Sequence, residues 1–439
     1  MSRLYEDAAY GPQGACYWAE TVTAPAWPQL DRDAQVDVAV IGGGFTGLNA
    51  ALHLAEQGAS VAVLEADHPG WGASGRNGGF CCLGGSKAPA ALLRRRFGDG
   101  ADTAWTRTEI AAVDHVDHLI RRLFLQVDLH SKGETLLAHK PRAFSQLQAS
   151  AEETGATYGV TPQLHSRADL ASEGMGGPWH GGMTLPIGFA LNPRKYHSGL
   201  GLAARQAGAE LYAESPVTDL TRTGNAGWSL TTARGTVRAR SVILATNGYS
   251  HETLPDWLRG RTLPVQSSVI VTRPLTEAEQ QAAGWWSNQM SYDSRVLLHY
   301  FRLMPDGRFL FGMRGGLRAT AAAQSRLSRR IRADFARMFP AWERVEITHE
   351  WSGLVCLMRN LVPFVGEIPG HPQLFAALGF HGNGVAMGSY AGRLVAGHAM
   401  GERLDAPDWL GTPPPRFPLG RHRRLLLAPA YLAAEALDL

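Results

Sequence analysis

Three glycines, Gly42, Gly44 and Gly47, are spaced so that they can bring backbone N–H groups against a diphosphate. Gly42 permits a tight turn, Gly44 lets the backbone approach the pyrophosphate, and Gly47 lets a helix pack closely on a strand. Phe45 and Thr46 lie at the start of that helix, where the N-terminal end carries a partial positive charge. This spacing favours dinucleotide binding.

Glu65, followed by Ala66, ends the next apolar run, about 20 residues beyond the glycines. A carboxylate at this position can accept a hydrogen bond from a ribose hydroxyl, and it disfavours a 2′-phosphate. NAD and FAD both fit this pattern, whereas NADP does not. The alternative is a glycine turn without a ligand, and the strand before it and the helix after it argue against that alternative.

A second segment rich in small residues, WGASGRNGGF, follows at residues 71–80. Small side chains and free backbone N–H groups allow a flat ring and a diphosphate to come close. The alternative is a flexible Gly/Ser loop, with its arginine as a surface charge. The candidate residues are Gly72, Ala73, Ser74, Arg76, Asn77, Gly78 and Gly79.

A third segment, GFHGNGVA at residues 379–386, is a glycine-flanked turn that leads into a helix. Such a turn presents backbone N–H groups and a positive helix end, so it favours a bound negative charge. A helix cap without any ligand contact is the alternative. The candidate residues are Gly379, Gly382, Asn383, Gly384, Val385 and Ala386.

The elements that position these residues follow from apolar periodicity. Residues 36–41 and 60–64 are predicted strands, and 47–57 has helical spacing, so together they predict a βαβ unit. Residues 241–248 and 374–378 are further apolar runs that end in glycine turns. The nucleotide-binding sheet is therefore expected to form from separated segments.

The strands predicted between residues 262 and 350 belong to a second domain. Tyr300 and Arg302 lie two positions apart on one of them and so share a face, where they offer an aromatic wall and a guanidinium for a carboxylate. A structural salt bridge with Asp293 is the alternative role for Arg302.

Length, charge and cysteine usage restrict the class of protein. At 439 residues the chain is long enough for two domains, and its net charge of +3 is too balanced to imply a nucleic-acid or anionic-membrane partner by charge alone. We expect no nucleic-acid partner. The four cysteines show no CxxC spacing, and no metal-ligand motif is present. The first residues lack a signal peptide, and no stretch approaches the ~20 apolar residues of a membrane span. We expect a cytoplasmic protein without a metal site.

The order and spacing of these motifs carry a family resemblance. The chain resembles FAD-dependent oxidoreductases of the glycine oxidase and D-amino-acid oxidase superfamily, most closely their gamma-glutamylputrescine oxidoreductase branch. The likeness is carried by GGGFTGLNAALHLAEQG at 42–58, by GASGRNGG at 72–79, by YFR at 300–302, by DGRFLFG at 306–312 and by GFHGNGV at 379–385.

The resemblance implies an α/β fold, with a Rossmann-like FAD-binding domain assembled from discontinuous segments and a mixed-sheet α+β substrate domain. The predicted division is an N-terminal arm at 1–34, an FAD-binding domain at 35–130, 191–261 and 351–410, a substrate domain at 131–190 and 262–350, and a C-terminal extension at 411–439.

The resemblance also implies roles for the candidate residues. Ser74, Arg76 and Asn77 would line the pyrophosphate and the flavin edge, while Gly78 and Gly79 would leave room for the isoalloxazine ring. The turn at 379–384 would meet the flavin pyrimidine, although His381 and Asn383 stand in swapped positions relative to the family version. The adenine side would be lined by Val217, Ala245, Thr246 and Asn247, and Val217 fits equally well as an ordinary buried strand residue.

The segment from Trp351 and Gly353 to Cys356 resembles the family segment that passes the flavin face. Monomeric sarcosine oxidase bonds its flavin through a cysteine in the corresponding segment, so Cys356 is a possible covalent attachment point beside the alternatives of non-covalent FAD and a plain buried thiol. The lysine that sarcosine oxidase uses with oxygen has no counterpart near Leu310.

The implied function is oxidation of a small amine or amino acid by hydride transfer to flavin N5, with hydrolysis of the imine and reoxidation by oxygen that releases hydrogen peroxide. The substrate pocket would use Arg302, Tyr300, Trp351 and His381. The alternatives are electron transfer to a quinone or another carrier, an NAD-linked dehydrogenase, and a flavoprotein without turnover.

Overall fold

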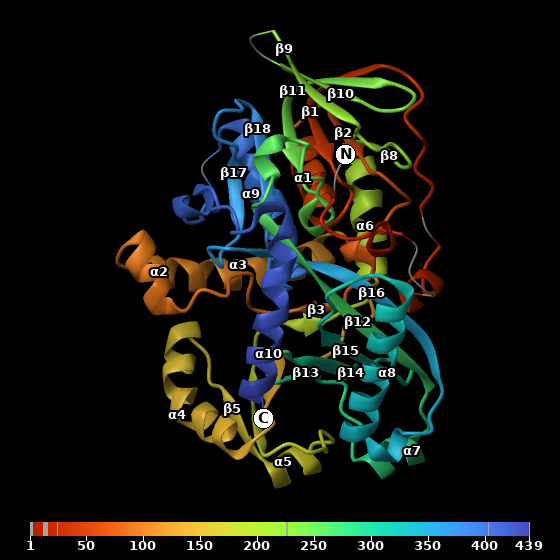
Figure 1. The fold of residues 1–439 in the computed structure, drawn as a ribbon, viewed down its shortest axis with the longest axis vertical. Coiled ribbons are helices and arrows are strands. Elements are labelled where there is room, and N and C mark those ends of the chain that lie inside the picture. Colours follow the sequence, from red (N-terminus) through yellow and green to blue (C-terminus); the bar gives the residue numbers. More distant parts are fainter. Residues whose placement is uncertain (1–2, 12–15, 24, 225–226, 403, 439) are drawn as a thin grey trace.

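The computed structural model describes residues 3–11, 16–23, 25–224, 227–402 and 404–438. Figure 1 shows two large sheets, one in the upper half of the view and one in the lower half, with the helix α10 crossing the middle of this face. The chain passes between the two sheets several times, because each is built from segments that lie far apart in the sequence.

The first sheet contains the predicted βαβ unit. Its order is β17-β18-β11-β1-β2-β8, in which the five strands from β18 to β8 are parallel and β17 is an antiparallel edge, while the β9–β10 hairpin extends β11. All side chains of β2 and β18 are buried, as is usual for parallel strands covered on both faces. The strands are β1 Ala34–Ile41, β2 Val61–Leu64, β8 Glu210–Tyr212, β9 Asp219–Thr223, β10 Gly227–Thr231, β11 Thr236–Leu244, β17 Phe364–Glu367 and β18 Leu374–Leu378.

The second sheet has the order β16-β12-β15-β14-β13-β4-β6-β5 and is antiparallel except for the parallel pair β13–β4. One of its faces packs on α8 through an aromatic cluster that includes Phe301, Phe309 and Phe335. The strands are β4 Glu134–Leu137, β5 Gln163–Ser166, β6 Gly181–Leu185, β12 Thr262–Pro274, β13 Met290–Asp293, β14 His299–Leu303, β15 Arg308–Arg314 and β16 Ile347–Met358. The short strands β3 Phe80–Cys81 and β7 Phe189–Ala190 pair separately.

The helices α1, α3, α6 and α9 share the main hydrophobic core with the first sheet. The two that begin at the glycine turns, α1 and α9, pack directly on each other. The helices are α1 Phe45–Glu56, α2 Ala90–Phe97, α3 Ala101–Arg122, α4 Pro141–Tyr158, α5 Arg167–Ser172, α6 Pro193–Gln206, α7 Glu277–Ala283, α8 Ala321–Met338, α9 Ala386–Met400 and α10 Leu427–Asp438.

One predicted domain boundary falls inside a continuous strand. β16 pairs with β12 from one end to the other, so residues 351–358, which the sequence analysis assigned to the FAD-binding domain, lie in the second sheet. The sequence pattern of an apolar strand is the same in either sheet. Only the strand with which it forms hydrogen bonds determines the sheet to which it belongs.

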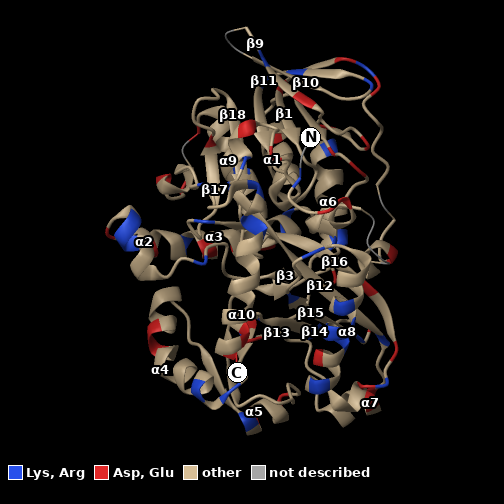
Figure 2. Cartoon of the chain, in the orientation of Figure 1, with Lys and Arg blue, Asp and Glu red and all other residues tan. Residues whose placement is uncertain are grey.

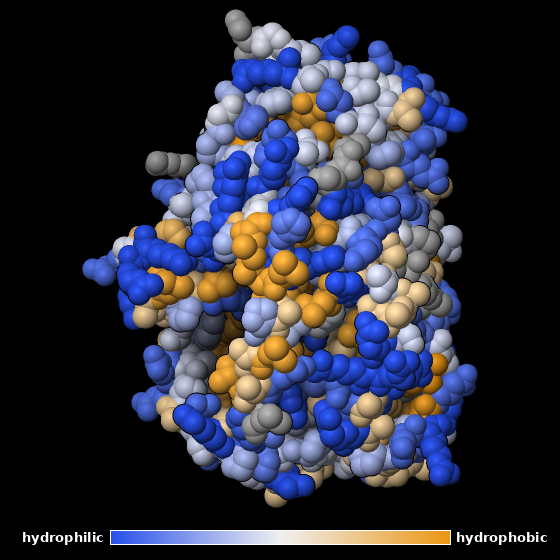
Figure 3. Space-filling model, viewed as in Figure 1, coloured by the Kyte–Doolittle hydropathy of each residue, from blue (hydrophilic) through white to orange (hydrophobic). Residues whose placement is uncertain are grey.

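The face seen in Figures 2 and 3 carries mixed charge and an apolar patch. Figure 2 shows that the positions of Lys and Arg, coloured blue, are concentrated on α2 and α8, with both signs interspersed elsewhere. Figure 3 shows apolar residues gathered over α10 and the turn before it, where Leu425, Leu432 and Leu437 are exposed. None of the helices in the described ranges combines the length and apolarity that crossing a membrane requires.

Candidate active site

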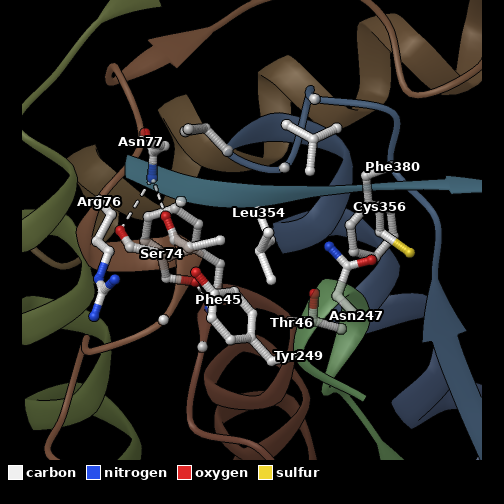
Figure 4. Close-up of a pocket in the computed structure, with 18 of the residues that line it drawn as sticks. Phe45, Thr46, Ser74, Arg76, Asn77, Asn247, Tyr249, Leu354, Cys356 and Phe380 are labelled. Atoms are coloured by element: carbon white, nitrogen blue, oxygen red, sulfur yellow. Dashed lines mark hydrogen bonds between the residues drawn. The ribbon is translucent and has the colours of Figure 1, made fainter. Parts of the chain in front are cut away.

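One large cavity lies between the two sheets and brings together segments from the whole chain (Figure 4). Four of the predicted cofactor residues, Gly47, Gly79, Gly379 and Ala386, do not line this cavity, although each adjoins a stretch that does. The predicted cofactor residues that do line it are Gly42, Gly44, Phe45, Thr46, Glu65, Ala66, Gly72, Ala73, Ser74, Arg76, Asn77, Gly78, Val217, Ala245, Thr246, Asn247, Gly353, Gly382, Asn383, Gly384 and Val385.

The first glycine turn places the start of α1 at the cavity. Gly42 has a φ of +104°, a conformation that favours glycine, and a Cβ on Gly47 would overlap the carbonyl oxygen of Gly42. The N-cap residue of α1, Gly44, has no side chain, and the Phe45 N–H donates instead to Ser74 Oγ at 2.8 Å. Gly44, Phe45 and Thr46 line the cavity, so the positive end of the helix faces it.

Glu65 is held beside this turn by backbone groups. Its Oε2 accepts a hydrogen bond from the Gly43 N–H at 2.8 Å, and its Oε1 accepts one from the Asp67 N–H at 3.2 Å. Burial raises the pKa of Glu65, and these backbone N–H groups act in the opposite direction. The carboxyl is thus fixed in the position where the sequence pattern places a ribose.

The loop at 71–80 is ordered by its own side chains. Asn77 Nδ2 donates to the carbonyls of Ala73 and Ser74 at 3.1 and 3.0 Å, as the dashed lines in Figure 4 show, and the Gly79 N–H donates to Asn77 Oδ1 at 2.8 Å. Arg76 is 8% exposed, and its guanidinium carbon lies 4.9 Å from the centre of the Trp71 ring. The alternative of a flexible loop with a solvated arginine is therefore wrong.

The turn at 379–384 is tied to two other walls of the cavity. The Gly379 N–H donates to Asn247 Oδ1 at 2.9 Å, and Asn383 Nδ2 donates to the carbonyl of Leu83 at 2.7 Å. The N-cap residue of α9, Val385, makes no side-chain cap. A second helix N-terminus thus faces the same cavity as that of α1.

His381 does not reach the cavity, although it was predicted in the substrate pocket. Its Nε2 accepts a hydrogen bond from the Met358 N–H at 3.1 Å, so its proton lies on Nδ1, which donates to the Gly85 carbonyl at 2.8 Å. The ring is fully buried, and this burial lowers the pKa of His381 to about 4. It joins β16 to the loop at residue 85 as a neutral group.

Tyr300 and Arg302 share a face, as predicted, but only Tyr300 lines the main cavity. Phe80 lies over both, because the centre of its ring is 5.6 Å from that of Tyr300 and 5.8 Å from the Arg302 guanidinium carbon. The guanidinium hydrogen-bonds His130 and Leu191 and lines a separate cavity. Asp293 binds Arg295 and His299, so the predicted alternative of an Arg302–Asp293 salt bridge is wrong.

Trp351 and Cys356, two further predicted residues on β16, differ in their relation to the main cavity. Trp351 is buried outside the main cavity, and its Nε1 donates to the Arg76 carbonyl at 2.7 Å, so it supports the loop at 71–80. Cys356 lines the cavity, close to Phe380 and Asn247 in Figure 4. Burial raises the pKa of the Cys356 thiol to about 12, which keeps the sulfur protonated at neutral pH.

The sequence analysis missed four polar residues of the main cavity, three on the second sheet and one on the segment after β3. Lys87, Glu134, Tyr292 and Arg314 all line the main cavity. Gly312 on β15 pairs with Tyr300, and Arg314 follows two residues later. The alternation of side chains along β15 could therefore have predicted that Arg314 lies on the same face as Tyr300. Glu134 had no such signal, because its strand joins the sheet from a distant part of the chain.

The cavity fits a dinucleotide flavin. Two helix N-termini suit a diphosphate and an electron-rich ring edge, Glu65 suits a ribose, and Gly78 lines the wall without a side chain. Within the described residues, no three His, Cys, Asp or Glu side chains come together as metal ligands.

Comparison with known proteins gives the same assignment. The family model described as FAD dependent oxidoreductase matches residues 37–397. The chain is 32% identical over 394 residues to a probable oxidoreductase, OrdL, of Haemophilus influenzae, covering 88% of each chain. It is 29% identical to the gamma-glutamylputrescine oxidoreductase of Escherichia coli, covering 90% of this chain and 91% of the relative.

Solved structures confirm the predicted fold class. The structure of glycine oxidase from Geobacillus kaustophilus superposes with a TM-score of 0.68 at 21% identity and covers 86% of this chain and 97% of the other. Because the family model spans most of the sequence, the predictions of family, enzyme class and FAD dependence are also confirmed. The chain belongs to the family of FAD-dependent oxidoreductases.

Proposed function

We propose that the protein oxidises a primary or secondary amine at the wall of the cavity formed by the second sheet. The observation that carries this proposal is a single cavity that joins both glycine turns to the polar residues of that sheet. The chain resembles relatives named for an aminated substrate, gamma-glutamylputrescine, and for glycine. Bound FAD would accept a hydride from the carbon beside the neutral amine and pass the electrons to oxygen, with release of hydrogen peroxide.

The residues of the chain position the reactants in this proposal. The start of α1 and the loop at 71–80 would hold the diphosphate, and the start of α9 would stabilise negative charge that develops on the flavin pyrimidine. Tyr300 lines the wall opposite, and its hydroxyl lies 3.0 Å from Ser267 Oγ. The division into an FAD-binding domain and a substrate domain is part of the same proposal, with the boundary moved to include all of β16 in the second.

The proposal also covers the cellular location of the protein and the electron acceptor. The four cysteines are free thiols, which supports the predicted cytoplasmic location. Oxygen is the proposed acceptor. A quinone or another carrier is the second candidate, because the lysine that sarcosine oxidase uses with oxygen has no counterpart near Leu310.

Anaerobic reduction tests the proposal. The purified holoprotein should show a flavin spectrum that an amine from a panel of polyamine derivatives, N-methyl amino acids and D-amino acids bleaches. Bleaching by none of these amines, together with bleaching by dithionite, would support a flavoprotein without turnover. Adding oxygen or a quinone to the reduced protein and measuring peroxide then distinguishes the two acceptors.

A matched pair of variants checks the site. Tyr300→Phe removes only the hydroxyl that contacts Ser267, and Tyr158→Phe removes a hydroxyl from Glu109, outside the main cavity. We expect Tyr300→Phe to change the rate or affinity of flavin reduction, while Tyr158→Phe should behave as the unchanged protein. Equal effects would argue against substrate binding at this wall.

A further inference from the structure

The helix α10 shows an apolar side to solvent. Its other side packs inward, where Leu427 and Tyr431 form a small cluster with Leu263 and Val265 of β12. A surface helix ordinarily carries charged or polar residues on its outer side, which keep it in water. The residues of α10 that are exposed are instead all apolar, namely Pro429, Ala430, Leu432, Ala433, Ala436 and Leu437.

The apolar surface continues beyond the helix. Leu425 in the turn before α10 is 66% exposed, and Val296, whose N–H donates to Asp438 at the end of α10, is 54% exposed. Figure 3 shows that the apolar residues over α10 and the turn before it form one patch, which we call the α10 patch. Single apolar side chains are normal on a protein surface, whereas a contiguous patch of them marks an interaction site.

Both ends of the α10 patch carry basic side chains. Arg421 is exposed in the turn before the helix and forms no ion pair with a described residue. At the other end Lys140 Nζ donates to the Leu437 carbonyl at 2.6 Å, and Arg142 is exposed two residues farther along the chain. Positive charge therefore borders the apolar surface at both of its ends.

One side of the patch is basic as well. Arg330 of α8 pairs with Glu435 of α10 at 2.8 Å, so the two helices lie side by side there. Arg326 is exposed one helical turn before Arg330, on the same side of α8, and pairs with no acidic group of the described residues. Both acidic side chains of α10 are engaged, because Glu435 binds Arg330 and Asp438 accepts the Val296 N–H at 2.7 Å. Figure 2 shows the basic positions gathered on α8.

Apolar side chains bordered by positive charge match the boundary of a membrane that contains anionic lipids. We propose that α10 and the turn before it rest on such a lipid surface, with the leucines among the acyl chains and the arginines at the phosphate headgroups. The helix is 12 residues long, whereas a membrane span takes ~20, so α10 would lie along the plane of the membrane.

A second copy of the chain would also cover the apolar residues, but the charges disfavour that partner. A two-fold pairing brings the same surface of each copy together. The basic ends and the basic side of one α10 patch would then lie against those of the other, and like charges across an interface weaken binding. An anionic lipid surface suits the leucines and the arginines at the same time.

The α10 patch lies next to the main cavity. The segment at 296–297, which donates two N–H groups to Asp438, leads directly to Leu298 on the cavity wall. A docked protein would hold this cavity beside quinones dissolved in the membrane, and this consequence rests on the proposed function. Docking itself involves neither flavin nor amine, so its test is independent of amine oxidation.

Flotation of the holoprotein with lipid vesicles tests the proposal. We expect the protein to float with vesicles made of equal parts of phosphatidylcholine and phosphatidylglycerol, and to float less as the salt concentration rises. It should stay free of vesicles made of phosphatidylcholine alone. No flotation with the anionic vesicles at low salt, or equal flotation with both kinds, would overturn the proposal.

Leu432→Gln combined with Leu437→Gln tests the apolar part of the patch. Both side chains are exposed, so the variant should keep its fold and flavin content while its affinity for anionic vesicles falls about tenfold or more. Leu202→Gln is the matched control, because Leu202 is 57% exposed on α6, which packs with the first sheet. Unchanged binding by the double variant would show that the leucines do not enter the lipid and would contradict docking through α10.

Arg326→Gln combined with Arg421→Gln tests the charges. The affinity for anionic vesicles should again fall about tenfold, because each arginine near the surface adds to the attraction. Arg234→Gln is the matched control, since Arg234 is exposed in the turn between β10 and β11, in the first sheet. Sedimentation of the unchanged protein distinguishes the other partner: a dimer that the leucine variant dissociates, without any vesicle binding, would assign the patch to a second copy and reject the membrane.

Discussion

The ring of Tyr300 lies so close to Gly78 that a Cβ on the glycine would come 2.8 Å from Cε2 of the ring. The same ring lies over Gly312, where a Cβ would overlap it. Two positions without side chains therefore fix one aromatic ring at the wall of the main cavity. This arrangement joins the loop at 71–80 to the second sheet.

Gly78→Ala should displace the Tyr300 ring or the loop. We expect flavin reduction by amines to become about tenfold slower or more, because small misplacements of reactants are costly. Stopped-flow absorbance measures the rate, and the flavin content of the purified variant shows whether FAD still binds. Gly411→Ala lies outside the main cavity and would bring the new Cβ only to an ordinary contact of 3.8 Å with the Val365 carbonyl oxygen, so it controls for loss of a glycine. An unchanged reduction rate would contradict the proposed place of the substrate.

Gly47→Ala should destabilise the protein and release FAD. The new methyl group would overlap the Gly42 carbonyl, so the turn at the start of α1 has to open, at a cost of about 3 kcal/mol. Gly384→Ala is the informative comparison, because no atom lies within 4 Å of its new Cβ. The Gly384→Ala apoprotein should have the same melting temperature as the unchanged apoprotein. Loss of flavin from that variant would show that the flavin ring needs this space.

His381→Ala should lower stability without changing the pH profile of flavin reduction. The substitution removes partners from the Met358 N–H and the Gly85 carbonyl and leaves a cavity, which costs about 2–4 kcal/mol. His118→Ala at an exposed site should shift the free energy of unfolding by less than about 0.5 kcal/mol. Loss of a titration from the rate profile of His381→Ala would instead indicate a catalytic role.

FAD should be released intact when the protein is denatured. The pKa of Cys356 is raised to about 12, so little thiolate is present to form a thioether at neutral pH. After acid precipitation the yellow colour should stay in the supernatant, and Cys356→Ser should retain its flavin. A coloured pellet that Cys356→Ser abolishes would show that the cysteine does carry the cofactor.

The apoprotein should lose stability between about pH 4.5 and pH 7 through Glu134. The pKa of this carboxyl is raised to about 7 in the folded protein from 4.5, so its stabilising effect is complete below pH 4.5 and is lost as the pH rises through 7. The free energy of unfolding of Glu134→Gln, relative to that of the unchanged protein, should rise by on the order of 2 kcal/mol between pH 4.5 and pH 8. Denaturant unfolding at each pH measures the difference, and a constant difference would mean that Glu134 is not buried in its neutral form.

Much of the first domain could be predicted from local patterns. The glycines at 42–47 with Glu65 form one strand–turn–helix unit, and the turn at 379–384 belongs to another. The parts of each unit lie close together in sequence, so spacing alone indicates its geometry. Substrate residues depend on which strands pair, and the sequence pattern does not specify this. Arg302 shows the difference, since it shares a face with Tyr300 but lines a separate cavity, where it hydrogen-bonds His130 and Leu191.

The sequence by itself determined a dinucleotide site and, through its resemblance, the flavin family. Only the tertiary structure decided that His381 ties two segments together and that Lys87, Glu134 and Arg314 face the cavity. The physical reason is range: turns and helix ends are set by neighbouring residues, whereas a wall built from β4, β13 and β15 exists only after distant strands have paired.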